Sequence, residues 1–225
     1  MTSSELEKTI KLGNLQGIYV LYGENTFALD MALKKIKHSF EELVPGINYV
    51  SIDENSITNL LPDIATPAFG YPKKLIVVKN SNLFKKEAKN KKTKWTDIQN
   101  KVKEYIEENI VDINENVLLV FYEETVEKNS LYQTIEKLGN ICNFENLRNV
   151  ELVKKLKSIC NSYEVNVDEE LLKQFVELVG NDMQEDINEI RKLIEYAGKG
   201  RNNYERSHGG LNNKENRGSY FRFNR

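Results

Sequence analysis

The residues with the clearest chemical pattern stand between an apolar run and a helical pattern near the start of the chain. Residues 18–22 are Ile-Tyr-Val-Leu-Tyr, and the run ends at Gly23. A buried strand that enters a helix through a glycine turn is the frame of a phosphate-binding loop, where backbone N–H groups hold a nucleotide. Such a loop also needs a second glycine, a lysine, and a Ser or Thr that contacts Mg²⁺.

This loop lacks those working residues. Gly23 is followed by Glu24, Asn25 and Thr26, with no second glycine and no lysine before the helical pattern begins. The negative charge of Glu24 would repel a phosphate at short range. We therefore interpret Gly23, Glu24 and Asn25 as a degenerate nucleotide loop and expect no cofactor. An enzyme stays as the alternative: a diverged nucleotide phosphotransferase that uses the same frame.

Other catalytic or metal-binding patterns are absent from the sequence. The two histidines are His38 and His208, and there is no HExxH or CxxC pair. Cys142 and Cys160 lack metal-ligand spacing and stand among apolar residues, which favours buried free thiols. Glu123 follows VLLVFY, where an acid that serves Mg-nucleotide could lie, but the degenerate loop leaves it no nucleotide. We predict no catalytic residue and no metal site.

A run of ten residues rich in lysine is a candidate DNA contact, because lysines bind phosphates with release of counterions. Its six lysines are Lys85, Lys86, Lys89, Lys91, Lys92 and Lys94. A solvated loop between a strand and a helix explains the same run, since no aromatic residue is interleaved for base stacking.

The elements that must position these residues alternate through the first 147 residues. Strands are expected at 17–22, 49–52, 75–78, 117–121 and 141–144, and helices at 27–40, 56–66, 96–109 and 129–138. Short apolar strands separated by helices predict an α/β domain over residues 1–147, with a parallel sheet covered on both faces.

After Leu147 the pattern is helical only. Three amphipathic segments follow, with Asp168 as the expected cap of the second, Gly180 as its end, and 182–196 as the third. They predict a small, lid-like, all-helical second domain over residues 148–198.

Composition separates the last 27 residues from the rest. The chain has 225 residues, 40% hydrophobic and 29% charged, with no apolar run near the roughly 20 residues of a membrane span, so we expect a cytoplasmic protein. Residues 199–225 contain two Lys, five Arg and two Glu (+5), which leaves −7 of the net −2 for residues 1–198. We expect this tail to be disordered, and its composition suggests a shift of reading frame near Gly200 that replaced a third domain.

The order of several segments resembles the delta subunit family of the bacterial DNA polymerase III clamp loader. The segments are GIYVLYGENTFALDMALKKI, IATPAFGYPKKLIVVKN, VLLVF and EDINEIRKLIEYAGKG. The resemblance implies an AAA+-type α/β domain without an ATP site, a helical lid, and a C-terminal collar domain that this chain lacks. It also implies a non-catalytic subunit of the polymerase III holoenzyme that binds the sliding clamp and helps to open it during DNA replication.

The turn at residues 67–72 carries the sharpest functional expectation. Two prolines and a glycine around Phe69 predict a rigid, exposed turn, and an aromatic residue held there can enter an apolar pocket at little entropic cost. The resemblance places the clamp-binding residues at Pro67, Ala68, Phe69 and Gly70, with Ala68 and Phe69 as the two presented hydrophobic residues. The alternative is that Phe69 packs beneath the strand that follows.

The resemblance implies the partners as well. They are the sliding clamp, primer–template DNA through the complex, and the other loader subunits (delta prime and tau/gamma), whose binding the missing collar would weaken. No membrane partner is expected.

Overall fold

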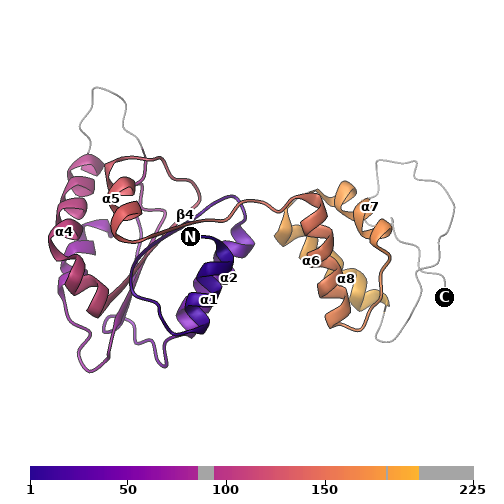
Figure 1. Ribbon diagram of the computed structural model, residues 1–225, viewed down its shortest axis with the longest axis horizontal. Helices are drawn as coiled ribbons and strands as arrows, with labels where there is room; N and C mark the ends of the chain where they lie inside the picture. The colour runs from indigo at the N-terminus through magenta and orange to yellow at the C-terminus, as the bar shows by residue number, and fades with distance from the viewer. Residues whose placement is uncertain (86–93, 181, 198–225) are drawn as a thin grey trace. The chain divides into compact units, whose positions relative to one another are not determined.

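The computed structural model describes residues 1–85, 94–180 and 182–197 (Figure 1). The expected disorder of the tail and most of the lysine run lie outside these residues. By internal contacts the chain divides into unit 1, Met1–Glu145, and unit 2, which begins at Asn146.

Unit 1 is built on a five-stranded parallel sheet. Its strands are β1 (Gly17–Tyr22), β2 (Tyr49–Ile52), β3 (Lys74–Lys79), β4 (Val117–Glu123) and β5 (Asn140–Asn143). The order is β2-β3-β4-β1-β5, and every pairing is parallel. The expected parallel sheet is confirmed, and each expected strand is found within two residues of its bounds.

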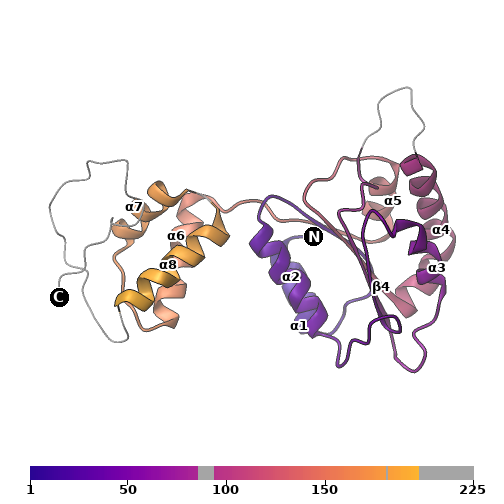
Figure 2. The same ribbon diagram turned by 180° about the vertical axis from the view of Figure 1, so that it is seen from behind.

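Helices cover both faces of this sheet (Figures 1 and 2). On one face, α1 (Ser3–Lys11) and α2 (Thr26–His38) contribute Leu6, Leu29 and Leu33 to an apolar core. On the other face, the strand side chains that point away from the first core form a second apolar core with four further elements. These are η1 (Ile57–Asn59), α3 (Leu60–Ala65), α4 (Lys94–Asn116) and α5 (Ser130–Leu138). This is the α/β arrangement, with a parallel sheet covered on both faces, that the sequence predicted.

Two helices differ from expectation. α1 was not expected, because it is short and Leu6 is its only fully buried residue; a capping box between Thr2 and Glu5 supports its first turn. α4 continues past the expected end at 109 with a kink at Asn109, whose φ is −119°. The side chain of Asn109 donates to the carbonyl of Tyr105, so it competes with the helical backbone bonds there.

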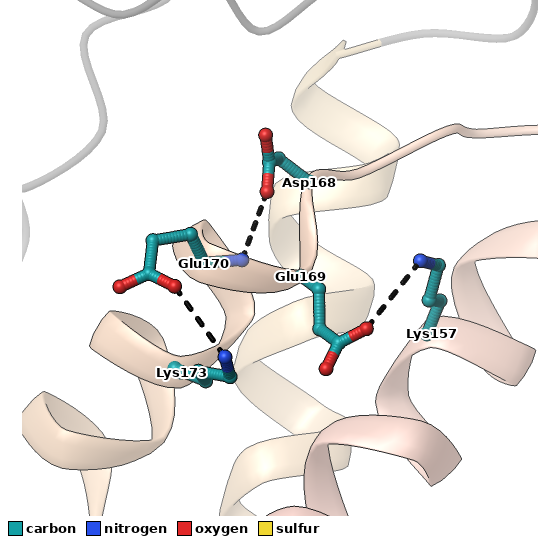
Figure 3. A network of polar contacts seen from close by, with 5 residues as sticks. All are labelled: Lys157, Asp168, Glu169, Glu170 and Lys173. Carbon is teal, nitrogen blue, oxygen red and sulfur yellow. Dashed lines mark hydrogen bonds and ion pairs between the residues drawn. The ribbon is translucent and has the colours of Figure 1, made fainter.

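Unit 2 contains α6 (Asn149–Ser162), α7 (Glu169–Val179) and α8 (Met183–Ala197). Figure 3 shows the polar contacts at the start of α7: the Asp168 carboxylate accepts from the Glu170 N–H at 2.9 Å, and Glu169 lies 3.9 Å from Lys157 of α6. The expected cap at Asp168 is thereby confirmed, and α7 ends at Gly180, whose φ is +119°.

Two further expectations can be compared with the structure. Cys142 and Cys160 are both buried and free, as predicted, and burial raises the pKa of each thiol to about 11. None of the described helices combines the length and the apolar character that a membrane crossing requires.

Candidate functional site

The turn between α3 and β3 presents Phe69 to solvent. The N–H of Tyr71 donates to the carbonyl of Ala68 at 3.1 Å, which closes a β-turn with Phe69 and Gly70 at its corner. Gly70 has a φ of +88°, a conformation that glycine adopts without strain. The Phe69 side chain is 70% exposed. The alternative that Phe69 packs beneath the following strand is therefore wrong.

The expectation that Ala68 is presented beside Phe69 is also wrong. Ala68 is only 9% exposed and belongs to the buried residues of unit 1, whereas Pro67 and Gly70 are exposed. Consecutive side chains in a tight turn point in different directions, so one of the two faces the protein when the other faces solvent. Phe69 is the large apolar side chain that this turn exposes.

A buried lysine is hydrogen bonded to the backbone that leads into the turn. Lys74, the first residue of β3, is 2% exposed, and its Nζ donates to the carbonyls of Asp63 and Thr66 at 2.9 and 3.1 Å. These carbonyls lie at the end of α3, where the helix leaves them without helical partners. Burial lowers the pKa of Lys74 from its ordinary value, while the charge of Asp63 acts in the opposite sense. Lys74 thus fixes the path of the chain on the way to Phe69.

Neighbouring loops at the same edge of the sheet are tied to this turn. Because all strands are parallel, the loops that precede β1, β2 and β3 share the amino edge. The hydroxyl of Tyr71 donates to Glu42 at 3.3 Å, the N–H of Leu75 donates to the carbonyl of Asn48 at 2.7 Å, and the Lys73 Nζ donates to the carbonyl of Leu15 at 3.1 Å.

Sequence reasoning missed two exposed apolar residues in these loops. Leu12 is 72% exposed and Ile47 is 39% exposed. Each stands next to a loop glycine with positive φ, Gly13 and Gly46 respectively, just as Phe69 stands next to Gly70. An apolar residue beside a turn glycine is the signal that could have identified them.

The degenerate nucleotide loop lies at the opposite, carboxyl edge, and two of its backbone N–H groups donate to carbonyls of the chain itself. The N–H of Asn25 donates to the carbonyl of Phe144 at 3.0 Å, and the N–H of Thr26 donates to that of Glu24 at 2.9 Å. The side chain of Asn25 accepts from the N–H of Ala28 at 3.0 Å and caps α2. In a phosphate-binding loop these N–H groups point at the ligand.

Glu123, at the position where an acid could serve Mg-nucleotide, is also hydrogen bonded within the chain. It is 5% exposed, and its Oε1 accepts from the N–H of Ser81 at 3.0 Å and from the Ser81 hydroxyl at 2.5 Å. Burial raises the pKa of Glu123 to about 7, although the bonds from Ser81 act against the rise. Its carboxyl group therefore holds the loop after β3 in place.

The lysine run begins at this carboxyl edge. Lys85 is exposed and follows the loop that Glu123 holds. Lys86, Lys89, Lys91 and Lys92 lie outside the described residues, and Lys94 begins α4 with a side chain that is not described. Phe69 and the start of the lysine run are thus at opposite edges of the sheet, and the fold does not bring the two candidate contacts together.

Comparison with known proteins agrees with this architecture. The family described as "DNA polymerase III, delta subunit" matches residues 19–167. The chain is 22% identical over 194 residues to DNA polymerase III subunit delta of Bacillus subtilis, covering 85% of this chain and 55% of that protein. It is 25% identical over 189 residues to the probable delta subunit of Aquifex aeolicus, covering 80% and 50%.

A solved structure shows the same fold. The Bacillus subtilis DNA clamp loader delta protein (YqeN) matches with a TM-score of 0.61 at 20% identity, over 87% of this chain and 58% of that one. The chain spans 50–58% of the length of these relatives.

Proposed function

The chain belongs to the DNA polymerase III delta subunit family, and from this premise we propose that it binds the sliding clamp through Phe69. The observation that carries the proposal is the 70% exposure of that ring on a turn braced by Lys74. A large apolar ring held in solvent by a fixed backbone costs little entropy when it enters a partner's pocket.

The mechanism that we propose uses binding energy to favour an open ring. Attachment through Phe69 shifts the clamp toward its open form only if the chain binds that form more tightly than the closed one. Burial of one Phe is worth about 1.5–3 kcal/mol, so the ring anchors the contact while surrounding loops supply the rest. Leu12 and Ile47, in loops that are hydrogen bonded to the turn, are the residues placed for this second role.

We further propose that the chain has no ATPase activity of its own and acts within the polymerase III holoenzyme. Its loop amides and the Glu123 carboxyl are engaged by the chain itself, which supports this proposal over a nucleotide phosphotransferase. ATP bound by the tau/gamma subunits would then control when Phe69 is presented, and Lys85 would contact the primer–template DNA.

A titration of the cognate clamp with the Phe69→Ala variant tests the proposal. We expect the dissociation constant to rise about 10- to 150-fold, the range that corresponds to loss of one buried Phe. Isothermal calorimetry on the whole chain gives this value directly.

A matched control comes from unit 2, where Val150 on α6 is 63% exposed. Val150→Ala removes a solvent-exposed apolar side chain far along the sequence from the turn, and we expect it to leave the affinity unchanged. If Phe69→Ala binds the clamp as tightly as the unaltered chain, the proposed function is wrong.

A further inference from the structure

We propose that the degenerate nucleotide loop is a clasp that holds the start of the linker to unit 2. The clasp consists of Gly23 and Asn25 on the loop and of Phe144 and Glu145 on the linker. The last residue of β5 is Asn143, and unit 2 begins at Asn146, so the loop grips the two residues that connect the sheet to the helices.

Three hydrogen bonds form the clasp. The N–H of Phe144 donates to the carbonyl of Tyr22 at 2.7 Å, and the carbonyl of Phe144 accepts from the N–H of Asn25 at 3.0 Å. The Asn25 side chain then donates through Nδ2 to the carbonyl of Glu145 at 3.4 Å. One residue beyond the end of β5, the N–H of Phe144 is therefore bonded to the last residue of β1 and its carbonyl to the loop.

Close backbone contact makes the position of Gly23 specific. A Cβ placed on Gly23 would lie 2.2 Å from the carbonyl oxygen of Phe144 and 2.6 Å from its carbon. Gly23 also has a φ of +138°, which side-chain-bearing residues rarely adopt. The linker backbone occupies the space that any side chain at this position would need, so glycine is required by the linker rather than by a phosphate.

Phe144 and Asn25 are also buried. Phe144 is 5% exposed and packs in the core with Leu29 and Leu33 of α2, and Asn25 is 3% exposed. The Asn25 side chain has two separate tasks, because its oxygen caps α2 and its nitrogen binds the linker.

A loop whose N–H groups can bind phosphate oxygens can also bind a carbonyl oxygen of the chain itself. A phosphate-binding loop offers backbone N–H groups to negatively charged oxygens. In this chain the carbonyl oxygen of Phe144 accepts from the Asn25 N–H and takes the place of such an oxygen. The start of the linker is consequently fixed by the chain itself, without nucleotide. This inference concerns the carboxyl edge and stands independently of the clamp contact at the amino edge.

Hydrogen exchange of the whole chain with the Asn25→Asp variant tests the clasp. Aspartate retains an oxygen that caps α2 but cannot donate to the Glu145 carbonyl, and its charge repels that oxygen. We expect the amides of residues 144–148 to exchange about five- to tenfold faster, the effect of losing one hydrogen bond, while the amides of α2 keep their protection.

Asn129→Asp is the matched control. Asn129 caps α5 by accepting from the N–H of Tyr132 at 3.0 Å, and its Nδ2 donates to the carbonyl of Leu83 at 2.8 Å, which repeats the geometry of Asn25 at another loop. This variant should accelerate exchange near Leu83 and leave residues 144–148 unchanged. Unaltered linker exchange in Asn25→Asp, or acceleration spread evenly over unit 1, would overturn the clasp.

Gly23→Ala provides a second measurement. The methyl group must displace Phe144, so we expect at least the same acceleration in residues 144–148 together with a lower melting temperature by circular dichroism. Linker protection that appears in the unaltered chain only after addition of Mg-ATP would also contradict the proposal.

Discussion

At the scale of single residues, the carboxyl group of Asp186 lies in apolar surroundings that do not stabilise a negative charge. It stands in the buried stripe of α8 with Met183, Ile187 and Ile190, and it is fully buried. Neither of its carboxylate oxygens has a hydrogen-bond partner among the described residues. Burial, together with the charges of Asp182 and Glu185, raises the pKa of Asp186 to about 7.

A pH-dependent stability of the helical unit follows. The pKa of Asp186 is about 3.9 in the unfolded chain. In the folded chain it is about 7. The contribution of Asp186 to the free energy of unfolding is therefore largest at low pH. It decreases as the pH rises between these two pKa values and levels off above the folded one. Urea unfolding of Asp186→Asn from pH 5 to pH 8 should lack this decrease.

At pH 8 the same variant should unfold with a free energy about 1–3 kcal/mol higher than the unaltered chain, the usual cost of an unsatisfied buried polar group. Glu177→Gln is a suitable control, because Glu177 is exposed on α7 and is not one of the charges that raise the pKa of Asp186. An unchanged pH profile in Asp186→Asn would show that this carboxyl group is solvated.

At the scale of elements, the connection between α3 and β3 matters more than either element alone. The Lys74 ammonium binds two carbonyls at the end of α3, and the turn with Phe69 lies between them and the strand. Lys74→Met retains the apolar stem and removes the donor. We expect the free energy of unfolding to fall by about 1–3 kcal/mol, and the affinity for the clamp to fall less than in Phe69→Ala.

Lys192→Met is the control for this change, because Lys192 forms an exposed ion pair with Glu189 at 2.6 Å, and such pairs contribute little. Chemical denaturation of the two variants compares them. Equal stabilities would mean that the buried ammonium does not brace the turn.

The loops at the amino edge make a second prediction at this scale. If the clamp contacts the edge beyond Phe69, Leu12→Ser and Ile47→Ser should each weaken binding about three- to tenfold, because each removes an exposed apolar side chain of moderate size. Leu178→Ser on α7, where Leu178 is 51% exposed, should have no effect in the same titration. Normal binding by both loop variants would confine the contact to the turn.

At the scale of the whole molecule, the division into two units predicts where the proposed clamp contact resides. Unit 1 contains both apolar cores and the Phe69 turn, and the clasp closes at its last residue, Glu145. A fragment of residues 1–145 should fold and bind the clamp within about threefold of the affinity of the whole chain. Circular dichroism and calorimetry measure the two properties, and a folded fragment that fails to bind would assign the contact to unit 2.

The sequence by itself determined the parallel sheet and the loss of the nucleotide loop's working residues, whereas it left two alternatives for Phe69, exposed on the turn or packed beneath the next strand. The first two are local properties: apolar strands of four to seven residues and the absence of a lysine after Gly23. Only the tertiary structure decided that Ala68 is buried, that Lys74 braces the turn, and that Asn25 holds a linker 120 residues away. Contacts of that kind depend on which segments the folded backbone brings within hydrogen-bond distance, and no local pattern encodes them.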